Sequence, residues 1–161
     1  MTQTWADMEE TQVPSWTNKA PSNWGTKKRG KLSSGQWQAI ALIHLPVTLI
    51  KLWGSFDEDD RRRQLLDNYM NLVQAITLAN LHTISPAHIE EYDDAIYSYM
   101  KGYKELFKHV TVHPIHHVAM HHGDELRGFG PSGASKNGAY YERHIHQLQE
   151  VNANQKFGEL E

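Results

Sequence analysis

The chain has 161 residues, the size of one domain, and contains no cysteine. Disulfides, thiolate nucleophiles and cysteine-ligated zinc are therefore excluded, and a metal ion would need imidazole, carboxylate or water ligands. Sixteen basic against nineteen acidic residues leave a net charge of −3, which does not favour binding to nucleic acid. Protonation of several of the eleven histidines below about pH 6.5 would make the chain net positive and weakens that argument.

The first 32 residues predict an extended arm, because prolines, glycines and the basic run KKRGK interrupt any helical or strand period. Three tryptophans (Trp5, Trp16 and Trp24) distinguish this arm from a disordered tail, in which aromatic residues are rare. We expect the arm, residues 1–32, to lie across a helical domain, residues 33–161, and to dock its indole rings there.

No membrane segment is predicted. The acidic beginning of the chain lacks the basic and apolar regions of a secretory signal. The most apolar stretch, AIALIHLPVTLIKLW, is shorter than the roughly 20 residues that a membrane span needs. We therefore expect a soluble intracellular protein of the cytoplasm or the nucleus.

An all-α bundle of about five helices is the predicted fold, since no segment alternates as a strand would. The expected helices cover residues 34–53, 58–81, 86–107, 114–127 and 140–152. The first of them is apolar nearly all round, which is typical of a buried helix, and Pro46 should kink or divide it. Its expected core residues are Trp37, Leu42, Leu45, Ile50 and Trp53.

Six histidines occur between His109 and His122, mostly on the fourth predicted helix. Because successive helical residues turn by about 100°, His113, His117 and His121 share one face, and His122 points largely the other way. One interpretation of this stripe is a metal site. The alternatives are that the histidines line a polar surface or cap neighbouring carbonyl groups, or that they take part in acid–base chemistry without a metal.

Two histidines four residues apart on a helix can bind one metal ion, so His117 and His121 are the candidate ligands. A further ligand would come from the next predicted helix or from nearby acids. The candidates are Glu142, His144, His146, Asp124 and Glu125. Two histidines and a carboxylate suit zinc, iron or manganese.

Five segments occur in a recognisable order: PSNWGTKKRGKLSSGQW, HLPVTLIKLWG, HPIHHVAMHHGDELRGFGP, YYERHIHQLQ and NANQKFGELE. With these segments the chain, from about Pro14 to its end, resembles the domain of unknown function that follows the transposase core in CACTA-like transposon proteins of basidiomycetes. The resemblance implies a transposon origin in a fungus and carries no established activity. The transposase catalytic core is absent from these residues, so strand cleavage is not expected of them.

The pattern of that family includes His-x3-His, Phe-Gly-Pro and Glu-Arg. These motifs fall here on His117 with His121, on residues 129–131, and on Glu142 with Arg143. The resemblance thus also pairs the two histidines with Glu142. Between the last two motifs the family is rich in tryptophan and phenylalanine, with a histidine after Phe-Gly-Pro. This chain reads SGASKNGAYY instead, so we expect a more mobile loop.

Two functions remain as hypotheses. The first is a stand-alone metal-dependent enzyme acting on a small molecule, with His117, His121 and Glu142 holding a divalent transition metal ion. Its acid–base or positioning groups would be His113, His116 or Tyr141. The second is a non-catalytic module that binds a protein or a nucleic acid. The crowded histidines and the altered loop favour the first hypothesis, and the basic arm favours the second.

Overall fold

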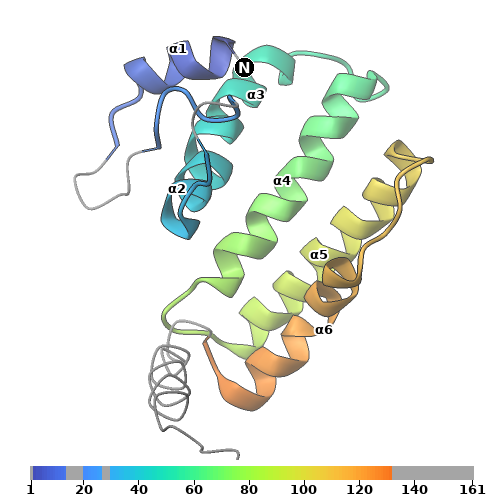
Figure 1. The fold of residues 1–161 in the computed structure, drawn as a ribbon. Coiled ribbons are helices and arrows are strands. Elements are labelled where there is room, and N and C mark those ends of the chain that lie inside the picture. The colour runs from blue at the N-terminus through green and yellow to red at the C-terminus, as the bar shows by residue number, and fades with distance from the viewer. Residues whose placement is uncertain (1, 14–19, 27–29, 132–161) are drawn as a thin grey trace, which may run out of the picture.

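The computed structural model describes residues 2–13, 20–26 and 30–131, and these ranges form an all-α bundle without strands (Figure 1). The predicted fold class is therefore confirmed. The expected helix at 140–152 lies outside the described residues. The helical elements are α1 (Thr2–Glu10), α2 (Ser34–Ala39), the π-helical turn η1 (Ile40–His44), α3 (Leu45–Trp53), α4 (Arg61–Ala79), α5 (Pro86–Leu106) and α6 (Pro114–Phe129).

Capping residues set where the long helices begin. The Asp60 carboxylate accepts a hydrogen bond from the backbone N–H of Arg62 at the start of α4. The Arg62 side chain also bonds to this carboxylate and holds its pKa down at about 2. Ser85 caps α5 in the same way, and Pro86 takes the first helical position, where a missing N–H costs nothing. These signals explain why the boundaries of α4 and α5 agree with the prediction to within a few residues.

Elements α2, η1 and α3 follow one another without a break, and Pro46 widens one turn of this continuous helix instead of dividing it. Proline has no N–H, and its ring would collide with the carbonyl four residues back in an α-helix. Here the N–H of Leu45 bonds to the carbonyl of Ile40, five residues back, and the chain continues as α3. The Ala41 carbonyl loses both helical donors, because Leu45 is engaged elsewhere and Pro46 has none. The hydroxyl of Tyr69 on α4 donates a hydrogen bond to this carbonyl at 2.7 Å. This bond connects the helical segment that contains Pro46 to α4.

The apolar core lies between α4, α5 and α6. Helix α5 runs back beside α4, and α6 packs against α5 (Figure 1). The buried cluster consists of Ala75, Leu78, Ile89, Tyr92, Ala95, Ile96 and Leu126.

The expectation that residues 34–53 supply the core was wrong for two of its five residues. Trp37 is 51% exposed and Ile50 is 50% exposed, whereas Ile40 is fully buried. The other three, Leu42, Leu45 and Trp53, are half-buried. An all-round apolar helix does not reveal which side its neighbours will cover.

The extended arm was a wrong prediction for its first residues, because Thr2–Glu10 forms α1. This short helix docks on α3 through an ion pair of 3.1 Å between Asp7 and Lys51. The Thr48 hydroxyl and the Lys51 ammonium lower the pKa of the Asp7 carboxyl. The sequence did not predict this helix because its nine residues hold too few apolar side chains to show a helical period.

The expected docking of the indole rings is confirmed for Trp24, which is buried. Its ring meets that of Trp37 edge-on at 6.5 Å, and its Nε1–H donates to the sulfur of Met8 at 3.2 Å. Trp5 is half-buried, and Trp16 lies outside the described residues. Within the described ranges, no helix is both long and apolar enough to cross a membrane.

Tyr69→Phe should destabilise the protein by about 1–3 kcal/mol, because it leaves the Ala41 carbonyl without a donor. Burial raises the pKa of Tyr69 to about 12, in keeping with a hydroxyl that is shielded from water. Urea denaturation measures the loss, and Tyr97→Phe, at a 62% exposed tyrosine, should change stability by less than about 0.5 kcal/mol. Equal stabilities of the two variants would contradict this role of Tyr69.

Leu126→Ala should cost about 2–5 kcal/mol of unfolding free energy, because this side chain is 2% exposed and sits in the core cluster. The matched control is Phe129→Ala on the same helix, where the ring is 85% exposed. That variant should stay within about 0.5 kcal/mol of the wild type. A loss below about 1 kcal/mol for Leu126→Ala would show that α6 is not part of the cooperative core.

Candidate functional site on α5 and α6

Two neighbouring residues of α5 hold α6 in one rotational setting. The hydroxyl of Tyr92 donates to the Ala119 carbonyl at 2.7 Å. The Asp93 carboxylate lies against Gly123, where an added Cβ would come within 1.9 Å of it, and it also bonds to Arg127. Burial, more than the nearby carboxylates, raises the pKa of Tyr92 to about 12. These contacts decide which side chains of α6 face outward.

The predicted metal pair lies on the outward face of α6. The rings of His117 and His121 are exposed and stand nearly perpendicular, with their centroids 4.6 Å apart. Nδ1 of His121 is 3.8 Å from the Asp124 carboxylate. The structure therefore brings two of the three proposed ligands together.

A third ligand is not found in the described part of the chain. There, no group of three or more His, Asp or Glu side chains is arranged to hold a metal ion. Asp124 bonds to Arg127 at 3.1 Å, and Glu125 bonds to His122 at 2.8 Å. The remaining predicted site residues, Glu142, His144, His146 and Tyr141, lie outside the described residues.

The other histidines of this region make structural contacts. His116 accepts the backbone N–H of His113 at its Nδ1, 3.0 Å away, and its ring packs on Tyr103 at 5.1 Å. His113 itself is exposed and stands just before the first turn of α6. His122 meets the ring of Tyr92 edge-on at 5.5 Å. His116 thus has a structural role at the start of α6, but it accepts a backbone N–H there and does not cap a carbonyl group as the alternative interpretation expected.

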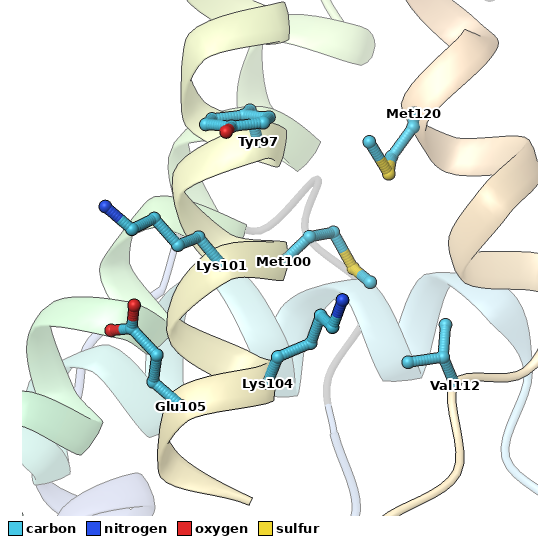
Figure 2. A pocket seen from close by; sticks show the side chains of 7 residues that line it. All are labelled: Tyr97, Met100, Lys101, Lys104, Glu105, Val112 and Met120. Carbon is cyan, nitrogen blue, oxygen red and sulfur yellow. The ribbon is translucent and has the colours of Figure 1, made fainter.

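A groove of about 580 Å³ lies between α5 and α6 (Figure 2). Met100 is buried, whereas Met120 is 41% exposed and Tyr97 is still more exposed. Figure 2 shows Met100 and Lys104 extending from α5 toward α6, with Met120 and Val112 on the opposite side of the space. The lining residues are Tyr97, Met100, Lys101, Lys104, Glu105, Val112 and Met120.

Sequence reasoning missed this groove. Apolar periodicity assigns apolar side chains to the core, yet Val110 and Val112 in the connection before α6, and Ile115 and Val118 on α6, are exposed. The available signal was an excess of apolar residues outside the buried stripe of α6. Exposed apolar side chains that form a contiguous patch can mark an interaction surface.

No family model, curated protein or solved structure matches the chain. The resemblance to a transposon-encoded domain therefore stays a prediction. The features that bear on function are the groove between α5 and α6 and the histidine pair on α6.

Proposed function

We propose that this protein is a non-catalytic interaction module whose binding surface is the groove between α5 and α6. The observation that carries this proposal is the combination of a recess of about 580 Å³ with apolar side chains that stand exposed at its edge. Exposed apolar side chains that gather in one place are typical of interaction sites. Methionine and tyrosine are also enriched in protein interfaces.

The dimensions of the groove favour a peptide segment as its occupant. Its α5 wall extends from Tyr97 to Glu105, a rise of eight residue steps or about 12 Å along the helix. This length accommodates two or three side chains from one face of a bound segment, as in other helix-lined grooves. An apolar lining in a chain of net charge −3 gives less support to nucleic acid as the occupant.

Site-specific photocrosslinking tests this proposal in cells that naturally produce the protein. A benzophenone side chain at position 120 should yield a discrete adduct, because this position faces the groove. The same group at position 74, an exposed residue of α4 outside the groove, is the control and should not give that adduct.

The protein identified in the adduct should then be purified and titrated against the full chain. Met120→Glu should weaken its binding by about tenfold or more, as expected for loss of a central apolar anchor. Circular dichroism should show that this variant stays folded, since Met120 is partly exposed. Identical adducts at positions 74 and 120, or unchanged binding by Met120→Glu, would contradict the proposal.

Metal binding by His117 and His121 is a second candidate function, and the short separation of their rings favours it. The pair would supply two imidazole ligands to zinc, iron or manganese, with Glu142 as the third ligand that the resemblance suggests. The hypothesis of a metal-dependent enzyme acting on a small molecule would place its chemistry here. His113, His116 and Tyr141 remain its proposed acid–base or positioning groups.

Calorimetric titration of tag-free protein with Zn²⁺, Mn²⁺ and anaerobic Fe²⁺ tests the second candidate. At neutral pH, His117→Ala and His121→Ala should each abolish binding, and Glu142→Gln should weaken it about tenfold or more. His122→Ala is the control and should retain the metal, because His122 faces Tyr92 on α5. The site is refuted if the wild type takes up no metal at micromolar concentration, or if only His122→Ala removes it.

A further inference from the structure

We infer that the partner segment in the groove is an amphipathic helix of another protein, with apolar anchors on one face and acidic residues beside them. This inference rests on the proposed function and adds the chemistry of the partner. Three features of the lining carry it: adaptable apolar walls, a cationic edge, and a charge pattern that disfavours a second copy of this chain.

The walls suit apolar anchors at helical spacing. Met100 is the most buried residue of the lining, and Tyr97, Val112 and Met120 are its other apolar members. Methionine side chains are unbranched and polarisable, so they adjust to anchors of different shape. Anchors at positions i, i+4 and i+7 of a bound helix span about 10.5 Å, which fits within the wall length of about 12 Å along α5.

The edge of the groove is locally cationic. Lys101 and Lys104 line it together with a single carboxylate, that of Glu105. Within the described ranges no ion pair joins either lysine to a carboxylate. Lysine stems can lie along an apolar wall while their ammonium groups stay in water. Acidic residues flanking the anchors would therefore meet two available cations, which favours recognition of an acidic segment.

The same charges argue against self-association through this surface. In a two-fold symmetric dimer the same patch serves both subunits, so each copy would bring Lys101 and Lys104 to the interface. Juxtaposed like charges oppose such a contact. The chain as a whole is acidic at −3, so the cationic edge is a local feature of the groove. A different protein with an acidic amphipathic helix is the better match.

Selection from a phage-displayed library of random 16-residue peptides on the full chain tests the inference. Enriched peptides should carry apolar residues three or four positions apart and a net negative charge. As synthetic peptides they should lose affinity about tenfold or more on Met120→Glu. Lys101→Glu and Lys104→Glu should each weaken them about two- to fivefold, more at low salt than at high salt. Lys31→Glu, an exposed change outside the groove, is the charge-matched control.

The outcomes separate this inference from the function on which it rests. Peptides that need Met120 but show no acidic bias, and that ignore both lysine substitutions, would overturn the acidic partner and leave the groove as an interaction site. Peptides unaffected by Met120→Glu would overturn both proposals. Sedimentation of the wild type as a dimer that Met120→Glu converts to a monomer would show instead that a second copy occupies the groove.

Discussion

The rotational setting of α6 on α5 is the constraint on which both candidate sites depend. Tyr92 and Asp93 are adjacent on α5, and they contact Ala119 and Gly123, one turn apart on α6. The hydrogen bond from Tyr92 fixes the turn of α6 that contains Ala119. One turn later, Gly123 has no side chain and so leaves room for the Asp93 carboxylate. A rotation of α6 by one residue, about 100°, would break both contacts and expose Leu126.

This rotational setting determines which histidines of α6 pack against α5 and which are exposed to solvent. His122 is turned toward Tyr92, while His117 and His121 are left in solvent one turn apart. His116 is drawn into the start of the helix, where its Nδ1 accepts a backbone N–H. That nitrogen is engaged as the acceptor of this hydrogen bond. Acid–base use of His116 would therefore have to rely on Nε2 or disrupt the first turn of α6.

The local features of the fold were predictable, and the long-range ones were not. The signals for α5 are local: Ser85, Pro86 and the apolar periodicity that follows them. The predicted ends of this helix therefore lie close to the observed ones. Pro46 predicted a disturbance of the helix. Whether the helix widened or broke depended on whether another element could donate a hydrogen bond to the freed Ala41 carbonyl. The hydroxyl of Tyr69, twenty-eight residues further along, does so. This contact pairs a carbonyl that the widened turn leaves without a helical donor.

The position of the core was a second long-range property. The stretch from Ala39 to Trp53 is the most apolar of the chain, yet it meets neighbours on only part of its circumference, and Ile50 and Leu52 are exposed. Hydrophobicity measures what a side chain gains by burial, and it does not say which surface will cover it. The less apolar α4, α5 and α6 pack against one another instead and bury the cluster around Tyr92 and Leu126.

The candidate sites differ in the same way. The His117 and His121 pair follows from helix geometry alone, because the two positions share a face of any α-helix that contains them. The groove could not be predicted from one helix, since Tyr97 and Met120 come together only through the packing of α6 on α5.

The histidine pair and the groove use different residues of α6. Neither His117 nor His121 is among the residues that line the groove. A metal ion held by the pair would therefore contact none of the residues that line the groove. The two proposed functions place no competing demand on the same side chain, so neither would have to be lost for the other to operate on one helix.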